Sequence, residues 1–420
     1  MSRIEYKNSG IFWQPFIPKS WHVTPLKYIL KKLSREKGAD DELLVCSNSG
    51  DIRKRGDSRL GLVANSNDIY QGVRSGDLLI HGMDTWHGAI AVSKFDGMCT
   101  PVVHVCDSSQ NKEYVATYLR NMASQQIFKL ISNGVRQNTS DFRSWDKLSR
   151  IPIPLPPLVE QEKIVSYLED KTSKIDEVIL AKEKQIKLLQ ELKDAEIANV
   201  ITRGLNPDVK MKRYDSLLSS ECPEHWCITR NKSFMSLVGE KVGRQSVSYT
   251  LLSLTTKGVI IRDVESGKGK FPKDFDTYQI VQRGELVFCL FDIDETPRTV
   301  GIVETGGMVT GAYTVLRVNE KYAIPEYVYY YYLCVDNIKA LKPYYSGLRK
   351  TVRADKFLQL YIPVPSVEEQ RTIIAYIENK NNKIEALVKN LEAEIAYLKE
   401  YKQKLVADCV IGQINVQCEQ

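Results

Sequence analysis

Apolar residues recur at heptad spacing in two long stretches of the chain, residues 153–206 and 362–415. A stripe with 3.5 residues per repeat is typical of a long helix that packs along another helix. The apolar positions are Leu168, Ile175, Ile179, Ile186 and Leu189 in the first stretch, and Ile384, Val388, Leu391, Ile395, Leu398 and Leu405 in the second. Polar residues break the pattern at Lys182, Lys193, Glu196 and Lys402. Each stripe has the alternative of packing on its own globular domain, but two matching stripes in one chain favour a helix pair.

The two stretches are copies of one sequence. They align without a gap at an offset of 209 residues, and 18 of their 54 positions are identical. The identical pairs include Pro154/Pro363, Glu160/Glu369, Gln161/Gln370, Tyr167/Tyr376 and Lys174/Lys383. A repeat of this length indicates an internal duplication, so the chain is predicted to contain two versions of one unit.

Both stretches carry signals for the ends of a helix. Ser366 stands three residues before Glu369, which is the spacing of a capping box in which each side chain bonds a backbone N–H. The first copy begins after the proline pair at 156–157, a position that favours a helix start. Gly204 and Gly412 stand where the helices are expected to end.

The duplication extends into the regions that precede the helices, residues 1–152 and 207–361. Trp21 matches Trp226 at an offset of 205, and Gly76 matches Gly284 at an offset of 208. Each region mixes strands with a helix, and the second one begins with a linker at 207–218. Strands are predicted at 78–80, 89–93 and 102–106 in the first region and at 286–290, 300–303 and 313–318 in the second, with helices at 112–131 and 326–341.

Composition and charge restrict the classes of protein that the chain fits. The polar N-terminus and the lack of an 18-residue apolar run lead us to expect a protein without a signal peptide or membrane span. Nine scattered cysteines indicate reduced thiols, and hence a cytoplasmic protein. Residues 1–152 carry a net charge of +6 and residues 207–361 a net charge of +4, whereas each helical stretch is acidic. This distribution fits a polyanionic partner, although ordinary surface charge gives the same totals.

Motifs for catalysis and cofactor binding are missing from the sequence. It has no phosphate-binding glycine loop, no Asn-Pro-Pro-aromatic motif of amino-methyltransferases and no zinc-deaminase signature. His81 and His87 are better explained as loop hydrogen-bonding residues than as catalysts. The acidic run at 292–295 is more typical of a turn than of a cation site, and Cys222 and Cys227 lack a second ligand pair at zinc spacing. We therefore expect no cofactor and no bound metal.

Basic and amide-bearing loops remain as candidate sites. Arginine, glutamine and asparagine read base edges bidentately, while lysine, serine and threonine commonly hold phosphates. Residues 51–59 contain four basic side chains, and the loops at 134–143 and 347–353 occupy equivalent places before the two helical stretches. One such loop is weak support for DNA binding, but its recurrence in both halves is stronger. The candidate DNA contacts are Arg53, Lys54, Arg55, Arg59, Arg136, Gln137, Asn138, Arg143, Arg349, Lys350 and Arg353, with Arg244, Lys257 and Arg298 as weaker candidates.

The arrangement resembles the specificity subunit of type I restriction–modification systems over nearly the whole chain. The matching features are a Pro-x-x-Trp opening, a Gly-Asp/Glu-Leu strand, a Gly-x-Arg loop and an Ile-Pro-x-Pro segment followed by Glu-Gln. They occur twice and in order, at Pro18/Trp21, Gly76-Asp77, Gly134/Arg136 and Ile153-Pro154 with Glu160-Gln161, and again at Pro223/Trp226, Gly284-Glu285, Gly347/Arg349 and Ile362-Pro363 with Glu369-Gln370.

The resemblance implies an α+β fold with two mixed target-recognition domains and two long helices that form an antiparallel coiled coil. The expected segments are 1–152, the helix at 153–206, a linker and second domain at 207–361, and the helix at 362–415. It also implies a non-catalytic reader of double-stranded DNA with a bipartite, non-palindromic target. The implied partners are two methylation subunits, which carry S-adenosylmethionine, and restriction subunits.

Two questions stay open from sequence alone. Glu160, Gln161, Glu369 and Gln370 are candidates for partner docking if they lie on exposed helix faces, with helix capping as an equal alternative. The alternative functions are a coiled-coil scaffold that joins two other ligand-binding domains and an enzyme such as a nuclease or methyltransferase. The paired basic loops disfavour the scaffold, and the missing motifs disfavour the enzyme.

Overall fold

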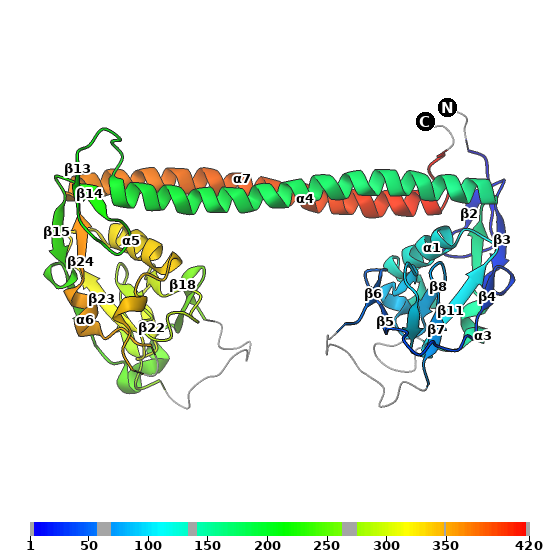
Figure 1. The fold of residues 1–420 in the computed structure, drawn as a ribbon, viewed down its shortest axis with the longest axis horizontal. Helices are drawn as coiled ribbons and strands as arrows, with labels where there is room; N and C mark the ends of the chain where they lie inside the picture. Colours follow the sequence, from blue (N-terminus) through cyan, green and yellow to red (C-terminus); the bar gives the residue numbers. More distant parts are fainter. Residues whose placement is uncertain (1–3, 57–68, 133–140, 263–274, 348–349, 417–420) are drawn as a thin grey trace. The chain divides into compact units, whose positions relative to one another are not determined.

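The computed structural model describes residues 4–56, 69–132, 141–262, 275–347 and 350–416. The chain divides into two compact units, the first comprising Met1–Lys182 with Ala393–Gln420 and the second Glu183–Glu392. The boundary falls inside both long helices, α4 (Leu158–Arg203) and α7 (Val367–Val410). Each unit therefore contains one mixed α/β domain and one part of each long helix (Figure 1).

The domain of the first unit is built on a four-stranded antiparallel sheet. Its strand order is β4 (Leu30–Lys32), β11 (Val103–Ser108), β8 (Leu78–His81) and β9 (Ile90–Val92). The other strand pairs are β1 (Tyr6–Asn8) with β2 (Phe16–Pro18), β3 (His22–Pro25) with β12 (Pro152–Leu155), β5 (Leu44–Cys46) with β6 (Ile52–Lys54), and β7 (Gln71–Val73) with β10 (Gly97–Cys99). The helices are η1 (Leu26–Tyr28), η3 (Thr85–His87), α1 (Lys112–Ser124), α2 (Ile127–Ile131) and α3 (Trp145–Ser149).

The second unit repeats this plan. Its four-stranded sheet has the order β16 (Met235–Val238), β23 (Thr314–Val318), β20 (Leu286–Phe288) and β21 (Val300–Ile302). The other pairs are β13 (Met211–Arg213) with β14 (Glu221–Pro223), β15 (Cys227–Arg230) with β24 (Tyr361–Val364), β17 (Leu252–Thr255) with β18 (Gly258–Ile261), and β19 (Gln279–Val281) with β22 (Gly307–Val309). The helices are η4 (Asn231–Ser233), η5 (Gly243–Ser248), α5 (Pro325–Asn337), η6 (Lys342–Tyr344) and α6 (Ala354–Gln359).

The predicted strands and helices are confirmed, with shorter helices than expected. The predicted helix at 112–131 is divided into α1 and α2 because Gln126 takes a left-handed conformation with φ of 57°. The helix predicted at 326–341 ends at Asn337, and Lys339 also has a positive φ. The predicted linker at 207–218 contains a strand, β13, which pairs with β14. Apolar periodicity shows where a helix lies but does not show a left-handed residue that ends it.

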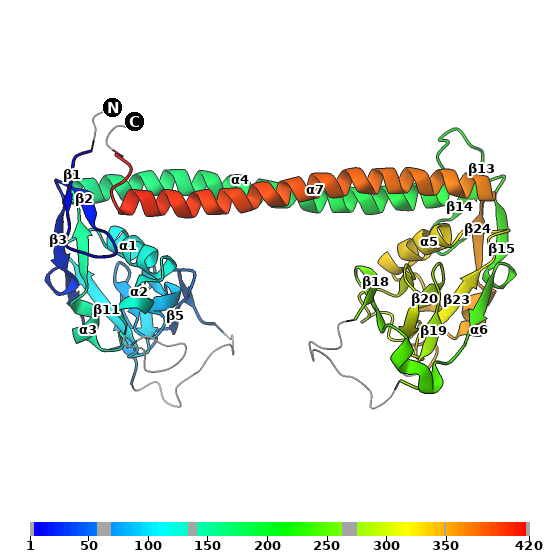
Figure 2. The same cartoon turned by 180° about the vertical axis from the view of Figure 1, so that it is seen from behind.

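The heptad stripes of α4 and α7 face each other, as expected. Every apolar position of the two stripes is buried or half-buried. The residues that break the pattern form bonds between the helices. In the first unit Lys182 pairs with Glu394, and Lys402 pairs with Asp176 at 2.6 Å. In the second unit Lys193 pairs with Glu385 at 2.8 Å, and the Tyr376 hydroxyl donates to Glu196. In each unit a later residue of α4 meets an earlier residue of α7, so the helices are antiparallel (Figures 1 and 2).

The ends of the long helices agree with only part of the sequence prediction. Gly204 and Gly412 have φ of 74° and 78°, so both helices end on a left-handed glycine as predicted. The Ser366 hydroxyl accepts a hydrogen bond from the Glu369 backbone N–H at 3.2 Å, which is one half of a capping box. The other half is wrong, because the Glu369 carboxylate bonds tryptophan and histidine side chains of the domain instead.

Candidate nucleic-acid interface

The repeated Glu-Gln pair at the start of each long helix connects that helix to its domain. The Trp21 indole donates to the Glu160 carboxylate at 2.9 Å in the first unit. In the second unit Trp226 donates to Glu369 at 3.0 Å, and His225 also bonds Glu369 at 2.9 Å. Both indole rings are fully buried, so each carboxylate satisfies a donor that has left water. These contacts explain why the Pro-x-x-Trp opening and the Glu-Gln pair occur together in both halves.

The two glutamines are completely buried, so the assumption of exposed faces is wrong for Gln161 and Gln370. The Gln370 side-chain oxygen accepts from the Ile324 N–H at 2.8 Å. Its nitrogen donates to two backbone carbonyls, of Tyr322 at 3.0 Å and Pro365 at 2.9 Å. Gln161 makes a similar set of bonds: its oxygen accepts from the Asn111 N–H at 3.0 Å, and its nitrogen donates to the side-chain oxygen of Gln110 at 2.9 Å and to the carbonyl of Pro156 at 2.8 Å. Each glutamine therefore fixes the loop that leads into α1 or α5, and it has no surface to offer a partner.

Each domain also contacts the C-terminal end of a long helix through a buried tyrosine. The first domain contacts α7 and the second contacts α4. Tyr114 on α1 donates to the carbonyl of Val410 at 3.1 Å, near the end of α7. Tyr327 on α5 lies 3.4 Å from the carbonyl of Ile201 and 3.3 Å from that of Pro363. Each domain is thus attached to both helices of its unit, and the helices hold it in a defined orientation.

The β5–β6 hairpin presents the basic side chains of the first unit. Arg53 and Lys54 are both exposed. Arg53 donates to the Asp51 carboxylate at 2.5 Å, and Lys54 pairs with Glu42. The pKa of Asp51 is held well below its ordinary value, mainly by the bond from Arg53 and further by bonds from the hydroxyls of Ser47 and Ser49. Asp51 therefore stays ionised at neutral pH and holds the arginine close to the turn.

A half-buried arginine, Arg120, bonds the turn of this hairpin. Arg120 on α1 donates to the carbonyl of Gly50 at 3.3 Å and to that of Ile90 at 3.0 Å. Burial lowers its pKa. Arg120 lines a cavity of about 820 Å³ between α1 and the two long helices of the first unit, together with Glu113, Trp86 and other side chains. The guanidinium links the sheet, the helix and the turn, so it fixes the position of the candidate reading hairpin.

The other described candidates are distributed over two parts of each domain. Arg143 is exposed and lies just before α3 in the chain. Helix α3 is on the other side of the first domain from the β5–β6 hairpin (Figures 1 and 2). In the second unit Lys350 pairs with Asp294 at 3.4 Å, and Arg353 pairs with Asp355 at 3.1 Å just before α6. Arg59, Arg136, Gln137, Asn138 and Arg349 lie outside the described residues.

The three weaker candidates differ in their surroundings. Arg244 in η5 and Lys257 in the β17–β18 turn are exposed. Arg298 is half-buried, donates to the Asn337 amide oxygen at 3.1 Å and lies 3.5 Å from the buried Asp336 carboxylate. Its side chain neutralises a buried charge at the end of α5, which is a structural role.

One counterpart of a candidate residue was missed in the sequence. The backbone N–H of Arg55 donates to Leu43 at 2.9 Å, and the N–H of Arg262 makes the same bond to Leu251 at 2.9 Å. These two arginines therefore occupy equivalent places directly after the hairpins. Arg55 and Arg262 are 207 positions apart. This offset lies between the 205 of Trp21/Trp226 and the 208 of Gly76/Gly284, so the alignment of the two halves could have paired these arginines.

Other candidate sites have simple structural explanations. His81 Nδ1 accepts from the Asp84 N–H at 3.1 Å, in agreement with the loop role. Within the described ranges, no group of three or more His, Cys, Asp or Glu residues is placed to hold a metal ion. No helix in the part of the chain that the structure describes is long and apolar enough to cross a membrane.

Comparison with known proteins finds the same family model in each half of the chain. Residues 88–188 and 303–397 each match the type I restriction modification DNA specificity domain. The chain therefore contains two copies of this domain, as the resemblance to type I specificity subunits implied. The first matched segment contains α1 and the second contains α5. Both segments extend into the long helices.

Relatives and solved structures of specificity subunits are similar over most of the chain. The MjaX protein of Methanocaldococcus jannaschii, provisionally named a type I restriction enzyme specificity subunit, is 24% identical over 72% of this chain and 68% of its own length. The MjaVIII specificity subunit of the same organism is 25% identical over 63% of both chains, which is less than two thirds of that relative.

The fold agrees with solved structures at low sequence identity. A chain from a structural study of complex assembly in the type I R-M system superposes with a TM-score of 0.68, at 14% identity, over 95% of this chain and 99% of its own. The HsdS subunit from Thermoanaerobacter tengcongensis gives a TM-score of 0.52 at 16% identity, over 95% and 98% of the two chains. The specificity-subunit fold, with two mixed domains and a pair of long helices, is therefore confirmed.

Replacement of Asp51 by asparagine is expected to strengthen DNA binding. The change removes one negative charge and releases Arg53 from its ion pair, so we expect about a threefold gain in affinity and a salt dependence steeper by about one phosphate contact. The measurement is a salt titration of duplex binding by fluorescence anisotropy. Asp40→Asn is the matched control, because it removes an exposed charge from the same unit without releasing an arginine. An equal gain in both variants would show that only net charge matters.

Proposed function

We propose that this specificity subunit reads a bipartite, non-palindromic DNA target and directs methylation and restriction subunits to it without catalysing a reaction itself. The observation that carries the proposal is a duplicated frame with unlike surfaces. Tryptophan, glutamate and glutamine attach each domain to the helix pair in the same way. The exposed loops on the two domains differ in sequence and charge. The two domains are attached to the helices in the same way, but their exposed loops differ. Such an arrangement suits two half-sites of different sequence.

The names of the relatives support this role. MjaX and MjaVIII are named as type I restriction enzyme specificity subunits, and the solved structure of highest similarity described above comes from a type I R-M system. We propose the same class of partner for this chain, namely methylation subunits that use S-adenosylmethionine, with restriction subunits added to give the cleaving complex. The candidate phosphate and base contacts are the exposed residues of the β5–β6 hairpin and of the segments before α3 and α6.

The partner surface is proposed to lie on the outer faces of α4 and α7. Glu160 and Glu369 are already bonded to tryptophan, and the neighbouring glutamines are buried. By contrast, several large apolar side chains on the helices are exposed. They include Leu180, Leu188 and Leu192 on α4 and Leu387, Tyr397 and Tyr401 on α7. Apolar helix faces of this kind suit helical segments of another protein.

The deciding experiment is methylome sequencing. A methylation-deficient host would carry this chain with the methylation subunit of its system, and a second host would carry the methylation subunit alone. We expect a new methylated motif with two unlike half-sites only in the first host. Two identical halves or one contiguous motif would contradict the bipartite target. A stable complex that gives no motif would favour the scaffold alternative.

A further inference from the structure

Each domain has a segment that leads into its short hairpin, β5–β6 in the first unit and β17–β18 in the second. This segment differs between the two domains in length and charge. Two equivalent pairs of backbone bonds mark its ends. In the first unit the N–H of Gly72 donates to Arg35 at 2.8 Å and that of Met98 donates to Glu42 at 2.9 Å. In the second unit Ile280 donates to Glu240 at 2.9 Å and Met308 donates to Thr250 at 2.8 Å. Between these fixed points the chain has six residues, 36–41, in the first unit and nine, 241–249, in the second.

The equivalence of these points rests on matched side chains. Gln71 donates to the carbonyls of Thr100 and Val103, and Gln279 donates to those of Thr310 and Tyr313, with similar distances of 3.3 and 2.6 Å against 3.2 and 2.6 Å. The two short strand pairs therefore superpose residue by residue. The three additional residues in the second unit allow the chain to form η5.

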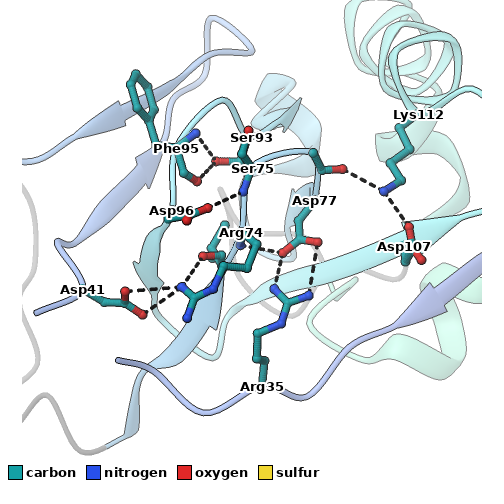
Figure 3. Close-up of polar contacts among 12 residues, drawn as sticks. Arg35, Asp41, Arg74, Ser75, Asp77, Ser93, Phe95, Asp96, Asp107 and Lys112 are labelled. Atoms are coloured by element: carbon teal, nitrogen blue, oxygen red, sulfur yellow. Dashed lines mark hydrogen bonds and ion pairs between the residues drawn. The ribbon is translucent and has the colours of Figure 1, made fainter. Parts of the chain in front are cut away.

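In the first unit this segment is acidic and tied to the domain. It contains three acidic residues and one lysine. Asp41 accepts from the Gly38 N–H at 2.7 Å and from the Arg74 side chain at 3.3 Å (Figure 3). Arg35, just before it, donates to the buried Asp77 carboxylate at 2.5 Å (Figure 3). Such a segment repels phosphate, and the Asp41 carboxylate is already engaged within the domain.

In the second unit the 241–249 segment has two basic residues and no acidic one. Several of its side chains are exposed to solvent. Val247 is 98% exposed, the highest value among the large hydrophobic side chains that the structure describes. Arg244 and Gln245 are exposed as well. A single exposed valine is unremarkable on its own, but here it stands beside an arginine and a glutamine.

The backbone under these side chains is fixed. The N–H of Val242 donates to Tyr278 at 2.9 Å, and Val242 is buried with Leu251 and Met308. Gly243 has φ of 55°, a left-handed conformation that glycine adopts at little cost. Within η5 the Gln245 N–H bonds Val242 at 3.3 Å. The segment therefore presents its side chains from a rigid turn, which limits the entropy lost when they bind.

The hairpins show the opposite distribution. In the pairing of β5 with β6, Arg53 and Lys54 occupy the places that Ile260 and Ile261 occupy in β18. These isoleucines are 41% and 61% exposed. The two basic side chains at these hairpin positions of the first domain are therefore isoleucines in the second domain, whose preceding segment carries Lys241 and Arg244 instead.

On the basis of the proposed function, we infer that η5 of the second domain reads base edges of one half-site, with Gln245 and Val247 as specificity-determining residues. Glutamine bonds adenine through its major-groove edge, and valine contacts the methyl group of thymine. Arg244 supplies either a guanine contact or a phosphate contact from the same turn. The first domain has no counterpart of this turn, so its half-site is read by other segments.

The test is selection of bound sites from a random duplex library by the full chain with its methylation subunit. We compare the natural chain with Gln245→Ala, Val247→Ala and the control Ile338→Ala, which removes another exposed apolar side chain from the same domain. We expect Gln245→Ala and Val247→Ala each to lose about 5- to 100-fold discrimination at one or two base pairs of a single half-site. The second half-site and the control should not change, and the retained half-site also shows that the variants are folded.

Two other outcomes separate the inference from the proposed function. If the natural chain selects a bipartite motif and both variants select the same motif with equal discrimination, the inference is wrong and the proposed function stands. A loss that affects both half-sites alike also overturns the inference, because it indicates a general weakening of binding. If the natural chain selects no motif, the proposed function fails and the inference fails with it.

Discussion

Gln370→Leu is expected to destabilise the second unit by about 3–5 kcal/mol and to leave the first unit intact. Leucine has a similar volume, but it leaves the N–H of Ile324 and the carbonyls of Tyr322 and Pro365 without their partner. Each buried polar group that loses its bond costs about 1–3 kcal/mol. The side chain is fully buried, so water does not replace these bonds without a local opening. Domain stabilities are of about this size, so the second domain should detach from its helix pair.

Hydrogen exchange measured by mass spectrometry would test this prediction. We expect protection in the start of α7 and in α5 to fall by about 100- to 1000-fold, while α1 and the start of α4 keep their protection. Gln161→Leu should give the mirror result in the first unit, and Gln190→Leu, at an exposed site on α4, should change neither. A uniform loss of protection in both units would show that the junctions are not independent. In the methylome experiment, the Gln370 variant should retain preference for one half-site only.

The helix pair could be predicted from sequence in detail because its signals are local. Heptad spacing, the gapless repeat and the glycines at 204 and 412 all follow from residues close together in the chain. The interruptions at Lys182 and Lys193 looked like defects in the stripe, but both lysines bond acidic residues of the other helix. Their partners, Glu394 and Glu385, lie about two hundred residues away in sequence, so the pairing needed the antiparallel register.

The role of the Glu-Gln pair could not be predicted for the same reason. A glutamate near the start of a helix suits capping, docking or a dipole interaction, and the sequence does not distinguish these. Trp21 lies 139 residues before Glu160, and Trp226 lies 143 residues before Glu369. The parallel occurrence of both motifs in the two halves was visible, but only the fold shows that an indole meets a carboxylate.

The candidate interface was predicted in part. Charge clustering pointed to the β5–β6 hairpin, where Arg53 and Lys54 are indeed exposed. It did not show that Arg298 neutralises buried Asp336, because that contact depends on the end of α5. It also gave little weight to η5, since an uncharged valine and glutamine have no distinctive signal in a single sequence. The structure adds the comparison between equivalent positions of the two domains, which shows where they differ.

Reversal of the hairpin charges, Arg53→Glu with Lys54→Glu, is expected to weaken duplex binding by about 100-fold at ~0.1 M salt. The affinity should also depend less steeply on salt, by about two phosphate contacts, because both side chains are proposed to neutralise phosphates. Each side chain is already paired, Arg53 with Asp51 and Lys54 with Glu42, so binding exchanges one anion for another. The gain in binding free energy per phosphate contact is then smaller than for an unpaired cation. Reversal of the charges, rather than their removal, is therefore needed for a large loss of affinity.

The matched control for this variant is Lys163→Glu with Lys171→Glu, which changes the net charge of the first unit equally from exposed positions on α4. If the hairpin contacts DNA, the control should lose only a few-fold in affinity and keep its salt slope. Site selection should further show that the hairpin variant loses affinity for all sequences nearly equally, since phosphate contacts position the domain while base contacts specify the target. Equal losses in the two variants would assign the effect to the overall field of the protein and remove the hairpin from the interface. A loss confined to particular base pairs would instead make Arg53 or Lys54 a reader of bases, and the first domain would then use its hairpin as the second is inferred to use η5.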